Sequence, residues 1–421
     1  MSIVHFEMSL LSFLYASLLL IPLGFACPSH EEAGVSMNYT MEATNNNDFR
    51  SVQQNAQPAP AKIAINNVRI FDGQRLLPAT TVVIEDDTIR SIGQCSHADE
   101  YVDGNGGVLL PGLIDAHAHP GNVTDLQDLS RYGVTTSMLM ACFQPQYCKS
   151  MKNHRGLTDI VAGSLPAAAP GSVHGNIVVM VDGNEDRLVA NASVASKWVD
   201  DAVAWGPDFV KLVAEVPGLD QETLNTLTKR SHEHGKRVAC HASALEAYTQ
   251  AVNAGADNIQ HAPTDEPISA SLARRIALAG HVATPTLTIL RAISDASPET
   301  RNYAAAEETV RLLKEAGVPI IAGTDANLVP GLIALVPFGI SLHEELRLLV
   351  KAGLSPAEAL RAATSVAAEH WGLHDRGVIA PGKRADLVLL SENPLEDISA
   401  TKSIQKIWLA GIEFSGAIGT F

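Results

Sequence analysis

The central part of the chain alternates between apolar, β-branched runs and helical patterns, and this alternation restricts the possible folds most strongly. Strands that are each followed by a helix form a parallel sheet. Eight expected strands lie between Leu113 and Asp325, a span of about 210 residues that suits the eight βα units of a barrel. These strands are Leu113–His117, Val134–Met140, Asp159–Leu165, Phe209–Val213, Arg237–His241, Asn258–His261, His281–Leu287 and Ile320–Thr324. The predicted fold class is therefore α/β, with a (β/α)8 TIM-type barrel.

Strand-like runs also occur before and after this pattern. They are Lys62–Phe71, Thr80–Ile92, Asp386–Leu390 and Ile404–Ile412. Two helical stretches, Leu342–Ala352 and Pro356–Ala368, lead back to the last of them. Short strands at both ends predict one composite β-sandwich domain, formed by residues 62–112 and 376–421. It brackets a barrel domain over residues 113–375.

The first 61 residues predict a leader and a linker. Leu10–Ala26 is apolar and a polar stretch follows it, which indicates a secretory signal peptide at residues 1–26. An uncut signal anchor stays an alternative, because the leader contains Glu7 and no Lys or Arg. Residues 27–61 are polar, contain Asn and Pro clusters, and predict a flexible arm. We expect a secreted protein with no membrane contact after cleavage.

Two further features are compatible with the secretory pathway. The sequons at Asn38, Asn122 and Asn191 are potential glycosylation sites, of which Asn122 is the least suited because it lies close to the expected site. Cys142 and Cys148 are close enough in sequence to form a disulfide in an oxidising compartment. The alternative for each cysteine is a small buried apolar side chain.

The charge balance excludes some classes of partner. The chain has 30 Lys and Arg against 46 Asp and Glu, a formal net charge of −16, and no basic block. Phosphate binding needs clustered Lys and Arg, so we expect no nucleic-acid partner. The hydrophobic fraction of 46% and the charged fraction of 18% also exclude a disordered chain and a coiled coil. The oligomeric state is left open, a homo-oligomer included.

Potential metal ligands stand at the ends of the expected strands. His117 and His119 end the first strand, where side chains at i and i+2 share a face. His241 and His261 end two later strands, and Asp325 follows the eighth. Barrel active sites are built at this end of the strands. Four imidazoles and a carboxylate suit Zn²⁺ or a similar metal, and they exceed one tetrahedral site with an open position, so we expect two ions.

A lysine occupies an unusual place in the same pattern. Lys211 lies inside the apolar run FVKLVA, where an unpaired ammonium is expensive to bury. Taken singly, a lysine or a strand-end histidine is more often a satisfied structural residue. Together with the five potential ligands it marks the ends of five different strands, which favours one shared site.

The motifs PGLIDAHAHP, FVKLVA, ACHAS, NIQHA and AGTDAN occur in this order, followed by LSPAEALRAAT and GVIAPGKRADLVLL. From Lys62 to the C-terminus, this series resembles the amidohydrolase superfamily of metal-dependent hydrolases. Within it, the chain is most similar to the imidazolonepropionase-like group, which includes prolidase-type dipeptidases and ochratoxinase. The resemblance implies a (β/α)8 barrel with a composite β-sandwich, in agreement with the strand pattern.

The resemblance also implies which residues hold each ion. His117, His119 and Asp325 would bind the more buried ion, and His241 and His261 would bind the other.

The same resemblance implies roles for two further residues. Lys211 would bridge both ions as a carbamate formed with CO₂, which turns a costly buried lysine into an anionic oxygen ligand. His174, in PGSVHGN, occupies a position similar to a GGHG loop that contacts substrate in the prolidase-like group. The first two glycines of that loop are replaced in this chain.

We therefore expect a metal-dependent amidohydrolase that cleaves an amide-type C–N bond of a small-molecule substrate, such as an N-acyl amino acid or a dipeptide-like compound. The nucleophile would be a metal-activated hydroxide, and Asp325 would move the proton. A lactonase, lyase or isomerase step on a natural product is an alternative at the same site. A non-catalytic binding protein is a second alternative, although every expected ligand position is filled.

Overall fold

The computed structural model describes residues 62–421, apart from residues 94, 330 and 331. The expected signal peptide (1–26), the arm (27–61) and the sequon at Asn38 lie outside the described residues. Among the helices that the structure describes, none is long and apolar enough to cross a membrane.

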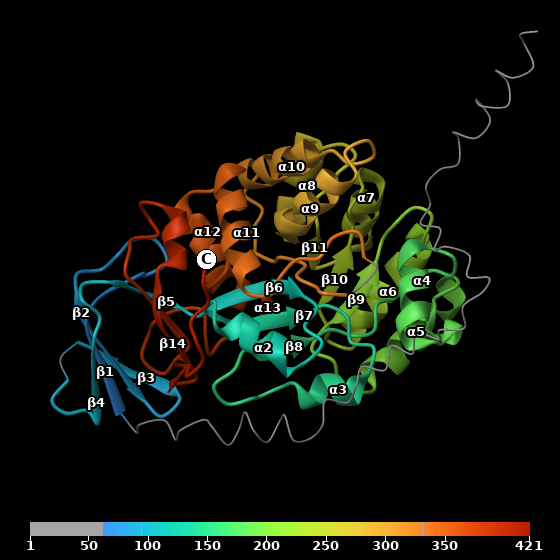
Figure 1. Cartoon of the computed structure of the whole chain (residues 1–421). Coiled ribbons are helices and arrows are strands. Elements are labelled where there is room, and N and C mark those ends of the chain that lie inside the picture. The colour runs from blue at the N-terminus through green and yellow to red at the C-terminus, as the bar shows by residue number, and fades with distance from the viewer. Residues whose placement is uncertain (1–61, 94, 330–331) are drawn as a thin grey trace, which may run out of the picture. The chain divides into compact units, whose positions relative to one another are not determined.

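Strands from both ends of the described chain form one sheet, seen in Figure 1 where blue strands lie beside red ones. Its order is β15-β14-β13-β5-β1-β2-β3, and β4 pairs with β1. The strands are β1 (Lys62–Ile70), β2 (Thr80–Glu85), β3 (Thr88–Ile92), β4 (Glu100–Asp103), β5 (Val108–Pro111), β13 (Leu387–Leu390), β14 (Ile404–Leu409) and β15 (Ile412–Glu413). Alternate side chains of β1, such as Ile63 and Ile65, enter a core with Leu387 and Trp408.

The middle of the chain forms two parallel sheets, β6-β7-β8 and β12-β11-β10-β9. The strands are β6 (Leu113–Ala118), β7 (Val134–Leu139), β8 (Asp159–Ala162), β9 (Val210–Val213), β10 (Val238–His241), β11 (Asn258–Gln260) and β12 (Val282–Thr284). All residues of β6, β7 and β9 are buried, as expected for parallel strands that are covered on both faces. The α/β class with parallel sheets is therefore confirmed.

Isolated parallel bridges continue the pairing beyond these two sheets. They include Gly163 with Phe209, Ala283 with Ile320, and Ala118 with Ala326. The first lies between β8 and β9, and the other two place the segment 320–326 between β12 and β6. The expected strand Ile320–Thr324 is thus present as a paired segment but not as a regular strand. One reason is that the amide of Ala322 donates its hydrogen bond to the carbonyl of Ala362, which belongs to a helix and not to a neighbouring strand (2.9 Å).

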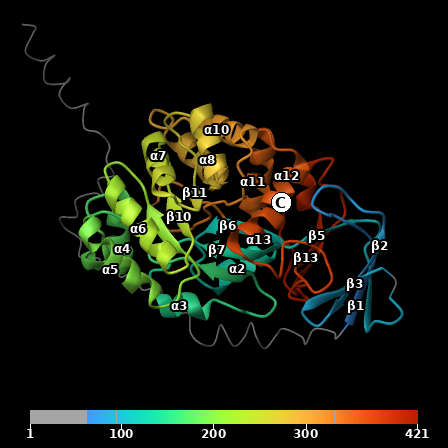
Figure 2. The ribbon, with the colours of Figure 1, turned by 180° about the vertical axis from the view of Figure 1, so that it is seen from behind.

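Helices follow most of the parallel strands, and α6 and α7 pack against β9, β10 and β11 (Figures 1 and 2). The helices are α2 (Val123–Ser130), α3 (Pro145–Ser150), α4 (Val173–Asp182), α5 (Ala192–Val203), α6 (Gln221–Glu233), α7 (Leu245–Ala254), α8 (Ala270–Ala279), α9 (Leu287–Ala296), α10 (Tyr303–Glu315), α11 (Ile340–Lys351), α12 (Pro356–Ala362) and α13 (Ser365–Trp371). The prediction of a single helix over Pro356–Ala368 is therefore wrong, because the structure has two helices there, α12 and α13. At the break, the carbonyl of Ala363 accepts a 2.7 Å hydrogen bond from Ile114 of β6.

Two loop features have local structural roles. The expected disulfide between Cys142 and Cys148 is present and encloses the start of α3. The sequon residues Asn122 and Asn191 are the N-caps of α2 and α5, where each side-chain oxygen accepts a backbone hydrogen bond. Their glycosylation stays a prediction.

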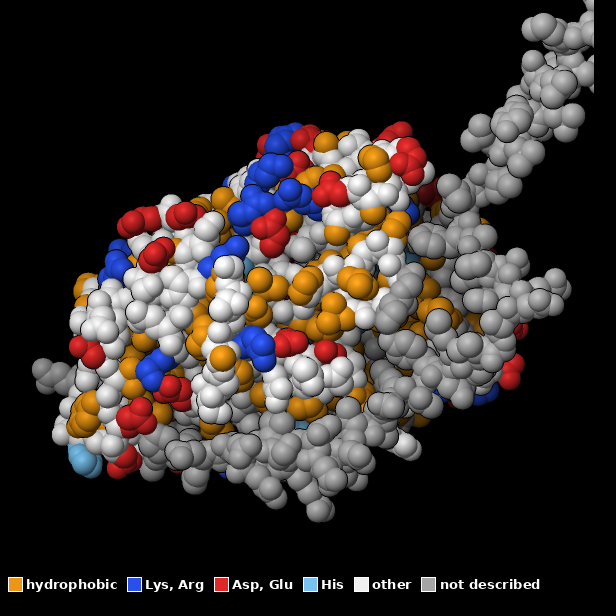
Figure 3. Space-filling view, viewed as in Figure 1, with side chains coloured by type: hydrophobic (Ala, Val, Ile, Leu, Met, Phe, Trp, Pro, Cys, Tyr) orange, Lys and Arg blue, Asp and Glu red, His pale blue; other side chains and the backbone are white. Residues whose placement is uncertain are grey.

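Acidic and basic side chains lie among one another in the region of α10 (Figure 3). Arg311 of this helix pairs with Glu308 and Glu315, one helical turn before and after it. Exposed pairs of this kind each contribute about 0.3–0.5 kcal/mol, so they affect stability little.

Candidate metal centre

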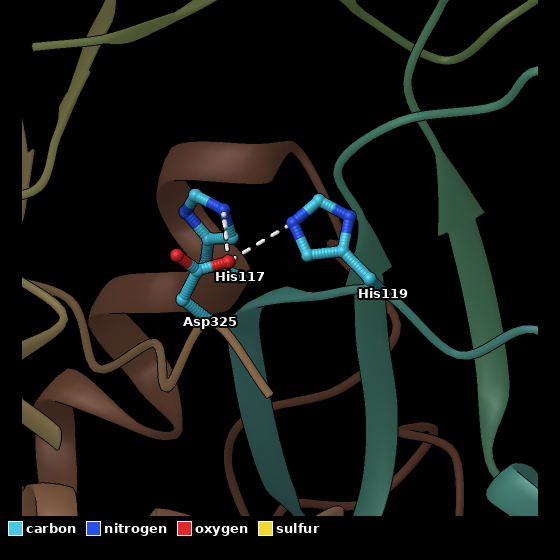
Figure 4. Close-up of side chains that lie close together, drawn as sticks. All are labelled: His117, His119 and Asp325. Carbon is cyan, nitrogen blue, oxygen red and sulfur yellow. Dashed lines mark ion pairs between the residues drawn. The ribbon is translucent and has the colours of Figure 1, made fainter. Parts of the chain in front are cut away.

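Two imidazoles from the end of β6 and one carboxylate converge on a single point (Figure 4). Nε2 of His117 lies 3.2 Å from Oδ1 of Asp325, and Nε2 of His119 lies 3.0 Å from the same oxygen. His117 is buried, whereas His119 and Asp325 are partly exposed. One potential ligand atom from each residue lies within 4.8 Å of the others, so a single ion could bind all three.

A buried carboxylate joins the two segments that carry these ligands. Oδ1 of Asp115 accepts hydrogen bonds from the amides of His117 and Thr324, both at 3.1 Å, and Oδ2 accepts one from the Thr324 hydroxyl at 2.7 Å. Burial raises the pKa of Asp115 to about 7, although these hydrogen bonds act in the opposite direction. Sequence reasoning assigned no role to Asp115, and its one available signal was its place two residues before His117.

The other two predicted histidines lie next to this cluster. The ring centroid of His261 is 4.9 Å from that of His117 and 4.4 Å from that of His241. Nδ1 of His261 is also 4.0 Å from Oδ2 of Asp325. The four predicted histidines, His119 included, therefore share one site with the carboxylate.

Three residues of this site have a left-handed backbone. The φ angle is 73° at His261, 51° at Thr286 and 57° at Asp325. This region is unfavourable for side chains with a Cβ atom, above all for a β-branched threonine, and such residues cluster at functional sites. The strain accompanies a contact, since Oγ1 of Thr286 lies 2.8 Å from Nδ1 of His261.

Lys211 projects from β9 and is 5% exposed. Its ammonium donates a hydrogen bond to Oε1 of Gln260, whose amide nitrogen lies 3.0 Å from Sδ of Met140. Burial lowers the pKa of Lys211 to about 8, while the carboxylate of Asp325 acts against this shift. The structure thus places Lys211 within electrostatic reach of the cluster. Sequence reasoning assigned no role to Gln260, although this residue directly precedes His261 in the motif NIQHA.

His174 lies on the other side of His241, with 4.2 Å between their ring centroids. Its Nδ1 is 2.9 Å from Oε2 of Glu215, and its amide donates a 3.0 Å hydrogen bond to Oε1 of the same carboxylate. Glu215 therefore fixes both the backbone and the ring of His174. Sequence reasoning missed this partner, which follows Lys211 in the loop after β9.

The electrostatics of the cluster suit metal ligands. Burial lowers the pKa of His117 to about 3 and holds the pKa values of His241 and His261 well below the usual histidine value, so these rings are neutral. Burial opposes the charge of Asp325, but its imidazole partners hold the pKa of this carboxyl well below the usual range.

An unpaired atom gives a direct test of whether a metal fits. Nδ1 of His117 is buried and has no hydrogen-bond partner among the described residues. A buried polar atom without a partner destabilises the folded protein unless a ligand or an ion binds to it. Neutral imidazoles beside an ionised carboxylate are the donors that Zn²⁺ and related divalent metals prefer, so the residues present fit such an ion.

A cavity of about 60 Å³ lies beside the cluster. Its lining includes His241, His261 and Asp325, together with Arg301 and Ile293. The cavity therefore brings three predicted ligands together with a cationic side chain that sequence reasoning did not single out.

Comparisons with known proteins agree with this arrangement. The sequence profile of the Amidohydrolase family matches residues 210–412, which contain Lys211, His241, His261 and Asp325. An uncharacterized protein of Mycobacterium bovis is 28% identical over 352 residues, 75% of this chain and 87% of that protein. The enamidase of Eubacterium barkeri is 24% identical over 364 residues, 80% of this chain and 89% of the enamidase.

The fold is similar to solved structures of the same kind. The crystal structure of a Xaa-Pro dipeptidase with bound methionine superposes with a TM-score of 0.70 and 21% sequence identity, covering 84% of this chain and all of the dipeptidase chain. The dipeptidase therefore has the same fold, while the family profile and the enamidase show similarity in sequence. The profile match and the relatives resemble the amidohydrolase superfamily, and they indicate a hydrolase that acts on carbon–nitrogen bonds.

Proposed function

We propose that this protein is a metal-dependent amidohydrolase that cleaves an amide-type C–N bond of an N-acyl amino acid or a dipeptide-like compound. The observation that carries the proposal is the contact of one ionised carboxylate, Asp325, with three imidazoles beside a cavity. The similarity to a Xaa-Pro dipeptidase supports a substrate of this size and chemistry.

The same proposal includes the finer architecture. The parallel bridges beyond the two sheets support a closed (β/α)8 barrel over residues 113–375, with the segment 320–326 as its eighth strand. The mixed sheet of terminal strands supports a composite β-sandwich of residues 62–112 and 376–421.

The five predicted ligands would hold two divalent ions, and zinc is the metal that we expect first. His117, His119 and Asp325 would hold one ion, and His241 and His261 the other. Metal ions bound there supply Lewis acidity and lower the pKa of water.

Lys211 would contribute to the same centre as a carbamate. Its low pKa supports this assignment, because a neutral amine is the form that adds to CO₂. The addition forms an N–C bond and releases a proton, which leaves an anionic oxygen ligand in place of the ammonium.

Two of the chain's own residues would then transfer the proton and contact the substrate. Oδ2 of Asp325 accepts a proton from the attacking water and returns it to the leaving nitrogen. His174 contacts the substrate, with its Nδ1 proton committed to Glu215 and its Nε2 left for hydrogen bonding.

A metal analysis combined with a substrate screen tests the proposed function. The purified protein should contain zinc or a related metal, and it should release amines from N-acyl amino acids or dipeptides. The His117→Ala variant, purified in the same way, controls for contaminating hydrolases. Opening of lactones without cleavage of any amide would favour the lactonase alternative instead.

We also propose that the protein is secreted after removal of residues 1–26. The apolar segment Leu10–Ala26 and the disulfide between Cys142 and Cys148 support an oxidising compartment. N-terminal sequencing of secreted material should find a start near Cys27 or Pro28. Membrane-bound protein that retains Met1 would contradict cleavage.

A further inference from the structure

Arg301 is the one arginine or lysine among the described residues that line the cavity beside the metal centre. Its guanidinium donates a 3.3 Å hydrogen bond to Oγ1 of Thr264 and forms no ion pair within the described part of the chain. A guanidinium has five N–H donors in a planar fork, so most of them are left for another partner. A cation without a counter-ion beside a substrate cavity points to an anionic group on the ligand.

The loop that carries Arg301 is held in place on both sides. The amide of Arg301 donates a 3.1 Å hydrogen bond to the carbonyl of Ser297, which follows α9. The amide of Asn302 donates a 2.6 Å hydrogen bond to the carbonyl of Thr264. Asn302 is also the N-cap of α10. The guanidinium therefore starts from a fixed backbone, which reduces the entropy lost when it binds a ligand.

A short series of contacts leads from Arg301 to the predicted ligands. The amide and hydroxyl of Thr264 both lie within hydrogen-bond distance of the Ser243 carbonyl, at 3.1 and 3.4 Å. Oγ of Ser243 lies 3.4 Å from Nε2 of His241. An anionic group paired with Arg301 would thus lie close enough to the metal centre for one small substrate to contact both.

The rest of the lining is aliphatic. Ile289, Leu290 and Ile293 of α9 line the same cavity, and the first two are 3% and 4% exposed. Branched aliphatic side chains favour an apolar group of similar size. The cavity therefore offers one cationic contact and one aliphatic wall next to the centre.

We infer that Arg301 binds the α-carboxylate of the substrate, and that the preferred substrates are N-acyl amino acids with an aliphatic side chain. The inference rests on the proposed function and names its substrate class. The fork of the guanidinium matches both oxygens of a carboxylate, and α9 contacts the aliphatic side chain. Hydrolysis of N-acetyl-L-leucine would consume one water and break the amide C–N bond, giving acetate and leucine.

Two probes that differ only in charge test the inference, N-acetyl-L-leucine and the neutral N-acetyl-L-leucinamide. Binding is measured by calorimetry on the full-length, metal-loaded protein when a probe is not hydrolysed, and kcat/KM is measured when it is. The unaltered protein should prefer the acid. Arg301→Gln should weaken its affinity or kcat/KM for the acid by about 10- to 100-fold and change the amide less than about twofold. Arg301→Lys should retain part of the preference, because it keeps the charge and loses the fork.

Arg291→Gln is the matched control, since Arg291 lies on α9, is 45% exposed and pairs with Glu344 at 3.2 Å. It should keep the preference for the acid. Equal losses for both probes in Arg301→Gln, no loss, or no binding of the acid by the unaltered protein would each overturn the inference. Selective binding of the acid without hydrolysis would support the role of Arg301 while contradicting the proposed amide cleavage, so the two failures are distinguishable.

Discussion

The hydroxyl of Thr324 donates a 2.7 Å hydrogen bond to the carboxylate of Asp115, across 209 residues of sequence. This bond ties the end of β6 to the segment that carries Asp325, and the amide of Asp325 donates a further 2.7 Å hydrogen bond to the carbonyl of His117. The metal cluster is therefore positioned by a pair of residues that would not themselves bind the ion.

Thr324→Val removes this hydroxyl and keeps the shape of the side chain. We expect metal affinity to fall about 10- to 100-fold, because partners that orient ligands have effects of this size. At pH 8, where most of the Asp115 carboxyl is ionised, the free energy of unfolding should fall by about 1.5–3 kcal/mol, the contribution of a hydrogen bond to a charged group. Metal titration and denaturant unfolding measure the two effects. Ser137→Ala is the control, since the buried Ser137 hydroxyl has no partner among the described residues. Unchanged metal affinity in Thr324→Val would contradict the positioning role.

His117→Ala and His119→Ala should each lower the metal content of the purified protein and abolish turnover. Each substitution removes an imidazole next to Oδ1 of Asp325, and a metal site loses affinity with every ligand removed. Elemental analysis and an activity assay measure both effects. His232→Asn should change neither, because His232 pairs with Asp257 at 2.8 Å on the exposed side of α6. Full metal content in both alanine variants would disprove the site.

Asp325→Asn separates the two proposed roles of this residue. The amide oxygen can still coordinate an ion, but the side chain cannot accept the proton from water. We expect kcat to fall by about 10²–10⁴-fold, the usual contribution of a general acid–base group, while metal content falls less than in His117→Ala. Stopped assays and metal analysis on the same preparations give both numbers. Near-normal kcat with lost metal would instead assign Asp325 a ligand role alone.

Lys211 should take up CO₂ in a pH-dependent way. Burial lowers its pKa to about 8, so the neutral amine grows from about a hundredth at pH 6 to about half at pH 8. The carbamate signal from ¹³C-labelled bicarbonate, followed by NMR, should rise over this range. Lys211→Met should abolish the signal, whereas Lys229→Met, at an exposed position of α6, should keep it. A signal that survives in Lys211→Met belongs to another amine and would refute the assignment.

Sequence by itself determined the order of strands and helices and the residues that stand at the strand ends. Both are local properties, since hydrophobic periodicity and the alternation of side chains along a strand need no knowledge of distant segments. His117, His119, His241, His261 and Asp325 could therefore be predicted as one set.

Tertiary structure decided how this set is held and what lies around it. The partners Asp115 and Thr324, Lys211 and Gln260, and His174 and Glu215 meet through contacts between different strands, which no local pattern contains. The expected helix Pro356–Ala368 breaks for the same reason, because the Ala363 carbonyl bonds to β6 instead of continuing the helix. Hydrogen bonds depend on distances between atoms, and sequence spacing fixes such distances within a strand or helix but not between segments that meet only after folding.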